Sequence, residues 1–162
     1  MWPFCRKLLM NAWTERKKKV LTGIRHTGIV VTDMVKALTF YRDLLGLKVV
    51  KDFSEEGDYI DSISGLTGVR VRMVKLTTDD GSMIELLQYL SHPSEAPDNQ
   101  QLCDIGCSHV AFAVDNIEKE YARLLKSGVS FNCSPYISPD GYAKVTFCAD
   151  PDGARIELVE VL

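Results

Sequence analysis

Apolar and polar positions follow a regular order of patterns from Gly23 onward. Ile24–Val31 is rich in β-branched residues and predicts a strand, and Thr32-Asp33 offers an N-cap for a helix directly after it. The apolar positions of that helix are spaced three and four residues apart, at Ala37, Phe40, Tyr41, Leu44 and Leu45. Gly46 stands where a helix C-terminus favours glycine, so we expect the helix to end there.

Three further strands complete this first half. They are predicted at Leu47–Phe53, Val69–Thr77 and Met83–Leu90, with a turn at residues 79–81 before the last strand. Residues 54–68 carry Gly and Asp and are expected to form a connection without regular structure. The predicted order is therefore β-α-β-β-β.

The same order returns after a polar, proline-bearing stretch at residues 91–105, which predicts a linker. A strand at residues 108–114 precedes a helix that begins with the capping box Asp115 and Glu118 and ends at Gly128. The remaining strands are predicted at Val129–Cys133, Ala143–Cys148 and Arg155–Val161.

Sequence matches at both ends of the two halves indicate a duplicated module. Gly23-Ile-Arg-His26 and Gly106-Cys-Ser-His109 open the halves, while Asp80-Gly-Ser-Met-Ile-Glu85 and Asp152-Gly-Ala-Arg-Ile-Glu157 close them. We predict an α+β protein of two tandem βαβββ modules, with this division: an extension at residues 1–22, a first module at 23–90, a linker at 91–105 and a second module at 106–162. A duplication places corresponding residues about a pseudo-twofold axis, so we expect two histidines and two glutamates in one symmetric arrangement.

The four repeated side chains His26, Glu85, His109 and Glu157 are the candidate metal ligands. Strand alternation puts each on a face with small or apolar residues, where an isolated carboxylate is costly unless it is paired or bound to a cation. Two imidazoles and two carboxylates suit one divalent ion, Ni, Co, Zn, Mn or Fe(II), with open positions for substrate. The alternative is that the histidines are ordinary sheet residues and the glutamates lie on exposed strand faces.

The tandem pattern with these four residues resembles the vicinal oxygen chelate superfamily, also called the glyoxalase, bleomycin resistance and dioxygenase superfamily. The resemblance covers residues 23–162, and its most specific elements are Phe40-Tyr-Arg-Asp-Leu-Leu-Gly-Leu47 and Asp150-Pro-Asp-Gly-Ala-Arg-Ile-Glu157-Leu158. It implies paired modules whose mixed sheets curve around a metal, and a homodimer with the site at or near its interface. Glyoxalase I enzymes have His, Glu, His and Glu at all four ligand positions, as this chain does.

The resemblance also implies a divalent-metal-dependent lyase or isomerase similar to lactoylglutathione lyase. The metal chelates two neighbouring oxygens of a small-molecule substrate, and Glu157, with Glu85 as its symmetry mate, takes a proton and returns it. An acyl-CoA epimerase, an extradiol dioxygenase and a non-catalytic protein that sequesters a small molecule are the alternatives within the superfamily.

Some residues depart from the known members, and the substrate-binding residues stay unassigned. Glyoxalase I enzymes commonly have an Asn at the position of Tyr89, and methylmalonyl-CoA epimerases usually have Gln at the position of Glu85. Tyr136 and Tyr142 lie in a segment that often closes over the site in this superfamily, although a plain turn built from Pro and Gly explains that segment as well.

Charge and cysteine content bear on partners and location. The net charge of −3 divides into +5 for the head, from six basic residues and one glutamate in residues 1–22, and −8 for the body, from 13 basic and 21 acidic residues. An acidic body argues against nucleic-acid binding, and no apolar stretch approaches the roughly 18 residues that span a membrane. The basic head permits a membrane-surface, transit or partner-docking role, or is a loosely attached extension. Five scattered cysteines suit reduced thiols in a cytoplasmic protein.

Overall fold

The structure is a computed structural model that describes residues 21–97, 101–106 and 109–162. The first module contains β1 (Thr27–Val30), α1 (Met34–Leu38), the π-helical segment η1 (Thr39–Leu44), β2 (Lys48–Glu56), α2 (Asp58–Ser64), β3 (Arg70–Thr77) and β4 (Met83–Tyr89). The second module contains β5 (Val110–Ala113), α3 (Ile117–Lys126), β6 (Tyr136–Ile137), β7 (Ala143–Ala149) and β8 (Arg155–Val161). Residues 1–20 of the predicted basic head lie outside the described residues.

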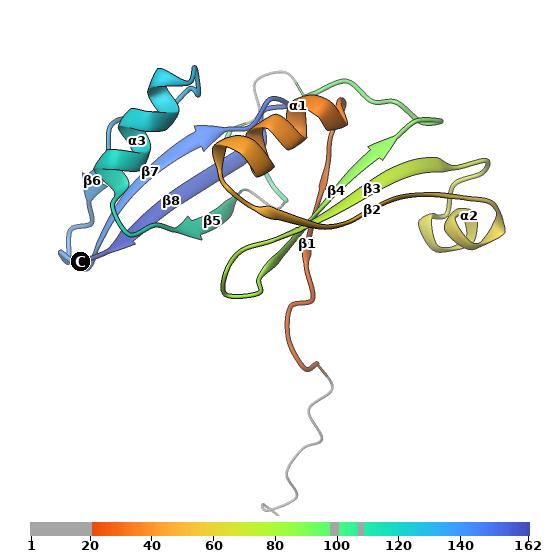
Figure 1. Cartoon of the computed structure of the whole chain (residues 1–162), viewed down its shortest axis with the longest axis horizontal. Helices are drawn as coiled ribbons and strands as arrows, with labels where there is room; N and C mark the ends of the chain where they lie inside the picture. The colour runs from red at the N-terminus through yellow and green to blue at the C-terminus, as the bar shows by residue number, and fades with distance from the viewer. Residues whose placement is uncertain (1–20, 98–100, 107–108) are drawn as a thin grey trace, which may run out of the picture.

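Each module forms its own four-stranded mixed sheet. The strand orders are β1-β4-β3-β2 and β5-β8-β7-β6, and Figure 1 shows the two sheets next to each other. In both sheets the first strand runs parallel to the last, while the other neighbours are antiparallel. The predicted α+β fold class is therefore confirmed. The two modules have the same strand order, and each of the two sheets is mixed.

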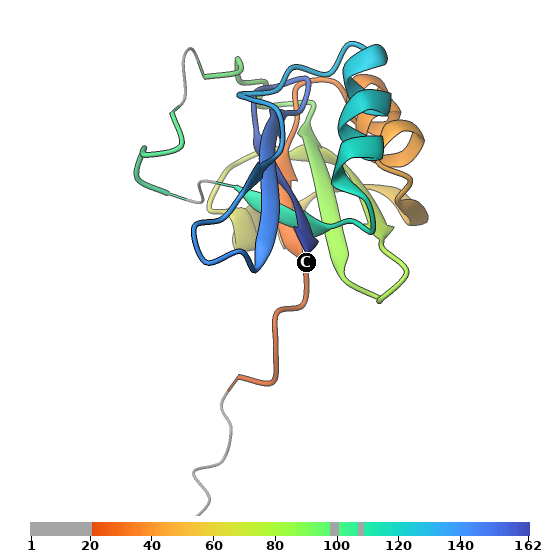
Figure 2. The ribbon, with the colours of Figure 1, turned by 90° about the vertical axis from the view of Figure 1, so that its left-hand side faces the viewer.

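Helices of the two modules lie side by side and cover one face of the sheets (Figures 1 and 2). Asp33 caps α1, where its side chain accepts from the backbone N–H groups of Val35 and Lys36. Buried residues from both modules form one hydrophobic cluster, which includes Phe40, Leu86, Leu124 and Leu158. Burial of this shared apolar surface holds the modules together.

Polar contacts also join the modules at this buried boundary. The Tyr41 hydroxyl donates to Oδ2 of Asp150 at 2.9 Å, and both side chains are buried. Burial raises the pKa of both groups above their ordinary values. The hydrogen bonds that Asp150 accepts lower its pKa, but the effect of burial is larger. The backbone N–H of Thr32 donates to Asp152 at 2.9 Å nearby.

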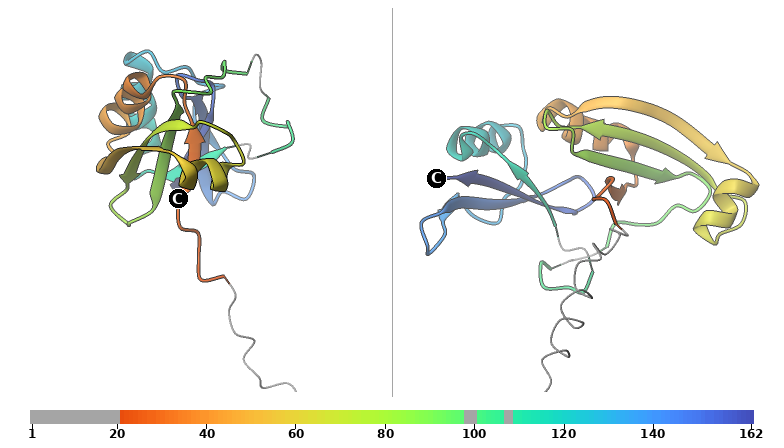
Figure 3. Two further views of the ribbon diagram at one scale, coloured as in Figure 1. Left: turned by 90° about the vertical axis from the view of Figure 1, so that its right-hand side faces the viewer. Right: turned by 90° about the horizontal axis from the view of Figure 1, so that it is seen from below.

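Residues 54–68 differ from the predicted irregular connection. β2 continues to Glu56, and α2 follows between Gly57 and Gly65, the latter in the left-handed conformation that ends a helix. Ile60 of α2 packs with Val69, Val71 and Met73 in a second small cluster at the outer end of the first sheet (Figure 3). A helix of seven residues with one buried side chain leaves too short a pattern to recognise in sequence.

The second module differs from the prediction in its edge strand and its helix cap. Residues 129–133 do not form the expected strand, and Phe131 makes one isolated bridge with Cys148. The edge strand is β6, only two residues long, inside the segment expected to be a loop. Asn116 caps α3 in place of Asp115, since its side chain accepts from the N–H of Lys119.

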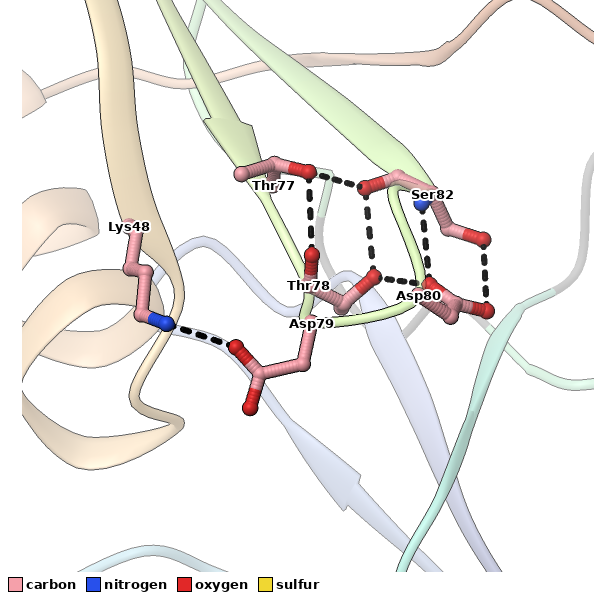
Figure 4. A network of polar contacts seen from close by, with 6 residues as sticks. All are labelled: Lys48, Thr77, Thr78, Asp79, Asp80 and Ser82. Atoms are coloured by element: carbon pink, nitrogen blue, oxygen red, sulfur yellow. Dashed lines mark hydrogen bonds and ion pairs between the residues drawn. The ribbon is translucent and has the colours of Figure 1, made fainter.

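The turn between β3 and β4 is where it was predicted. Asp80 accepts from the backbone N–H of Ser82 at 2.9 Å and from the hydroxyls of Thr78 and Ser82, as Figure 4 shows. Gly81 has a φ of 87°, which favours glycine. These bonds fix where β4 begins, and with it the position of Glu85 on that strand.

In the described parts of the chain, no helix is long and apolar enough to cross a membrane. Cys103, Cys133 and Cys148 are free thiols, and Cys5 and Cys107 lie outside the described residues. Burial raises the pKa of Cys148 to about 11, so this thiol stays protonated at neutral pH.

Candidate metal centre

The first pair of candidate ligands meets where β1 runs beside β4. His26 directly precedes β1, and the parallel register places Gly28 opposite Glu85. Nε2 of His26 lies 3.2 Å from Oε2 of Glu85, a carboxylate that is 8% exposed. The other carboxylate oxygen, Oε1, lies 3.2 Å from Nζ of Lys75 on β3.

The second pair repeats this geometry in the other module. His109 directly precedes β5, and the register places Ala111 opposite Glu157 of β8. Nε2 of His109 lies 3.2 Å from Oε2 of Glu157. The ring of Phe147 on β7 packs edge-on against the imidazole, with ring centres 5.3 Å apart. In each module, the histidine before the first strand thus meets the glutamate on the last strand.

The separation within each pair suits two ligands of one ion. Ligand atoms each about 2.1 Å from an ion are about 3.0 Å apart at octahedral angles and about 3.4 Å apart at tetrahedral angles. The observed 3.2 Å lies between these values. The ligand atom of His26 in this geometry is Nε2, while Nδ1, on the other side of the ring, is buried without a hydrogen-bond partner among the described residues. The donor set therefore fits a divalent metal.

The four residues do not gather into one site within a single chain, which corrects the expected arrangement. Among residues 21–97, 101–106 and 109–162, no group of three or more His, Cys, Asp or Glu side chains is placed to hold an ion. The structure brings together two pairs instead. The sequence repeat determines the His–Glu pair within each module. The distance between the two pairs depends instead on how the modules pack through their shared hydrophobic cluster.

Two cavities in the described structure lie away from both pairs. One of about 490 Å³ lies between the modules and is lined by Phe40, Leu44, Val129 and Asp150 among others. The other, of about 140 Å³, lies beside the end of β4 and is lined in part by His92. Neither cavity includes any of the four candidate ligands.

Sequence reasoning missed Lys75, which contacts Glu85 directly. The signal was present, because alternation along residues 69–77 puts Lys75 on the same face as Val71 and Met73. Its contact with Glu85 depends on the register of β3 against β4, which pairs these two residues. Tyr136 and Tyr142 are 75% and 64% exposed, and a role for them in substrate contact stays a prediction.

Comparison with known proteins identifies the family. Residues 23–158 match the model of the Glyoxalase/Bleomycin resistance protein/Dioxygenase superfamily. The uncharacterized protein YaeR of Escherichia coli is 30% identical over 141 residues, which are 86% of this chain and 97% of that protein. Lactoylglutathione lyase of Schizosaccharomyces pombe is 30% identical over 142 residues, and the match takes in 84% of this chain but only 46% of that enzyme.

Similarity to solved structures agrees with the sequence comparison. A glyoxalase family protein from Bacillus cereus superposes with a TM-score of 0.81 at 26% identity, covering 91% of this chain and 98% of that protein. The likeness includes both modules, since it extends over nearly the whole described structure. The chain belongs to the Glyoxalase/Bleomycin resistance protein/Dioxygenase superfamily.

Proposed function

We propose that the protein is a divalent-metal-dependent lyase or isomerase of glyoxalase type. One observation carries the proposal: the same His–Glu pair, with the same 3.2 Å separation and equivalent strand register, occurs in both modules. The pair keeps this geometry in both modules although the residue opposite the glutamate differs, Lys75 opposite Glu85 and Phe147 opposite Glu157. Two such pairs provide the two imidazoles and two carboxylates of one metal site, His26, Glu85, His109 and Glu157.

We infer that the complete site forms in a homodimer. The pairs of one chain do not meet, so the His26–Glu85 pair of one copy would face the His109–Glu157 pair of a second copy. A twofold axis that makes one such contact makes the other as well, giving two equal sites. The free thiols and the absence of a membrane-spanning helix in the described residues are compatible with a cytoplasmic location.

The chemistry follows from an acid–base pair beside a cation. A bound divalent ion would supply two coordination positions for neighbouring substrate oxygens and stabilise the negative charge of an enolate or enediolate. Glu157 would take the proton from the adjoining carbon, because its carboxylate contacts His109 and, among the described residues, has no lysine contact of the kind that holds Glu85. Return of the proton to the neighbouring carbon gives an isomerised product, and return to the other face of the same carbon gives an epimer.

Metal content tests the proposal directly. We expect about one divalent ion per chain in protein purified without added metal, measured by plasma mass spectrometry. His26→Ala and His109→Ala should each weaken metal binding by about 10-fold or more, while His92→Ala, an exposed histidine outside both pairs, should not.

Proton exchange separates catalysis from simple binding. Glu157→Gln should abolish exchange of the substrate α-proton with deuterated water, followed by NMR with the methylglyoxal–glutathione adduct and acyl-CoA epimers as candidate substrates. Full activity of a metal-free Glu157→Gln variant would overturn the proposal. Oxygen uptake with catechols would instead identify an extradiol dioxygenase, and a protein that purifies empty and binds a ligand unchanged would be a sequestering module.

A further inference from the structure

Two lysines face each other on the first sheet, next to the candidate ligand Glu85. In the antiparallel pairing of β2 and β3, Lys51 lies directly opposite Lys75. Like charges in directly opposed positions destabilise a sheet. The arrangement therefore costs stability, and an anion placed between the two ammonium groups would remove that cost.

A β-bulge brings Lys51 to this face. The register advances from Val49 opposite Leu76 to Lys51 opposite Lys75, which leaves Val50 as the extra residue. Without the bulge Val50 would oppose Lys75, and the side chain of Lys51 would point to the other face of the sheet. Bulges often redirect a side chain in this way next to functional sites.

The charge of the two lysines is only partly compensated. Nζ of Lys51 lies 3.9 Å and Nζ of Lys75 lies 5.9 Å from the centre of the Phe53 ring. Lys75 contacts Glu85, but Lys51 has no carboxylate partner among the described residues. Glu55 shares this face four residues further along β2, about 13 Å away along the strand. One ammonium group beside the candidate metal pair is thus left without a counter-ion.

The second module does without these charges at the corresponding positions. Phe147 occupies the position of Lys75, since it is the residue opposite Glu157 on the neighbouring strand. Asn132 lies next to Phe147, where Lys51 lies next to Lys75 in the first module, and its backbone N–H donates to the Phe147 carbonyl at 2.9 Å. The same framework therefore folds with an aromatic residue at this place, and the lysine pair is not required by the module.

We propose that Lys51 and Lys75 bind an anionic oxygen group, a carboxylate or a phosphate, that the substrate carries beside its metal-chelating oxygens. This inference rests on the proposed function, which supplies the metal-chelating part of the substrate. It adds that the substrate belongs to the class of compounds with a further anionic group. The ring of Phe53 lies within cation–π distance of both ammonium groups. Lys75 also contacts Glu85, so Lys51 would supply most of the free donors to the anion. In the proposed homodimer, Phe147 from the second module of the other copy would contact an uncharged part of the same substrate.

Binding measurements test this without turnover. With metal-loaded protein, calorimetry would compare 3-phosphoglycerate with glycerate and malate with lactate, since each pair shares one α-hydroxy acid group and differs in an added phosphate or carboxylate. We expect the member with the additional anionic group, 3-phosphoglycerate or malate, to bind more tightly in at least one pair, and the larger affinity ratio identifies the preferred group. Lys51→Met should reduce that ratio by about threefold to tenfold, and Lys75→Met should do likewise. Lys126→Met, which removes an exposed charge from α3, is the matched control and should leave the ratio unchanged.

A second measurement uses metal-free protein, so that the inference can be judged if the metal site fails. Titration with inorganic phosphate should shift the backbone amide NMR signals of Lys51 and Lys75 in a saturable way, and Lys51→Met should remove the saturation. The melting temperature of Lys51→Met should be equal to or above that of the parent chain, because a like-charge pair is lost. Equal ligand ratios in Lys51→Met and the parent, or no saturable phosphate shift, would overturn the inference even if metal binding and turnover hold. Saturable phosphate binding in a protein that takes no metal would refute the proposed function alone.

Discussion

Replacement of Tyr41 by Phe should destabilise the fold, because it removes a hydroxyl that joins the two modules. Among the described residues this hydroxyl is the donor to Oδ2 of Asp150, while Oδ1 keeps the backbone N–H groups of Asp152 and Ala154 at 2.9 and 2.8 Å. A hydrogen bond to a charged group contributes about 1.5–3 kcal/mol, so we expect a loss of about 2 kcal/mol in the free energy of unfolding. For a chain of this size, that loss corresponds to a melting temperature lower by about 4–8 °C.

The loss should depend on pH through Asp150. Burial raises the pKa of this carboxyl group above its ordinary value, and the hydrogen bond from Tyr41 opposes the rise. A carboxyl group with a raised folded-state pKa contributes stability that is fully present below the unfolded-state pKa and is lost as the pH rises through the folded-state pKa. Without the hydroxyl the folded-state pKa rises further. Destabilisation by Tyr41→Phe should therefore be largest at neutral pH and smaller where Asp150 is protonated.

Urea unfolding followed by circular dichroism, at one protein concentration and from about pH 4 to about pH 8, measures both effects. Tyr59→Phe is the matched control, since Tyr59 is 66% exposed and its change should stay within about 0.5 kcal/mol. A Tyr41→Phe loss below about 0.5 kcal/mol, or one that is the same at every pH, would refute the role given to this hydrogen bond.

Three further predictions, tested with four substitutions, concern other features of the fold. Asn116→Ala should lower the free energy of unfolding by about 1 kcal/mol because it removes the N-cap of α3, whereas Asp115→Ala should change it little; chemical denaturation would compare them. Leu86→Ala, at a fully buried position of the shared cluster, should cost about 3 kcal/mol in the same assay. The Asp61 side chain accepts hydrogen bonds from the backbone N–H groups of residues 68 and 69, and these bonds lower its pKa. The stability that Asp61 contributes is therefore present at neutral pH and is lost as the pH falls through its folded-state pKa. Asp61→Ala should therefore speed amide hydrogen exchange at residues 68–69 at neutral pH, and unchanged exchange there would contradict this.

Most of the fold could be predicted from residue patterns because the strands and long helices carry clear periodicity. Ile29 of β1 and Val31, which directly follows it, are buried while Val30 is 54% exposed, as alternation predicts. The pattern fails where elements are short or where neighbours compete. β6 has only two residues, and Asp115 and Asn116 are adjacent residues that both favour an N-cap position.

The candidate site could be predicted in part for a different reason. The repeat identified His26, Glu85, His109 and Glu157, and the structure places them in two equal pairs. Their distribution over two separate places depends on how the helix faces of the modules pack, which no local pattern encodes. The contact of Lys75 with Glu85 requires the register of two strands, and the position of Lys51 opposite Lys75 requires a bulge.

The cluster shared by both modules also bears on whether either half of the chain folds alone. Neither module buries its helices alone, since Phe40 and Leu86 of one and Leu124 and Leu158 of the other lie in the same cluster. The predicted linker at residues 91–105 would then act as a tether that raises the effective concentration of one half for the other. Two separately made fragments, cut within residues 91–97, should associate through these helices.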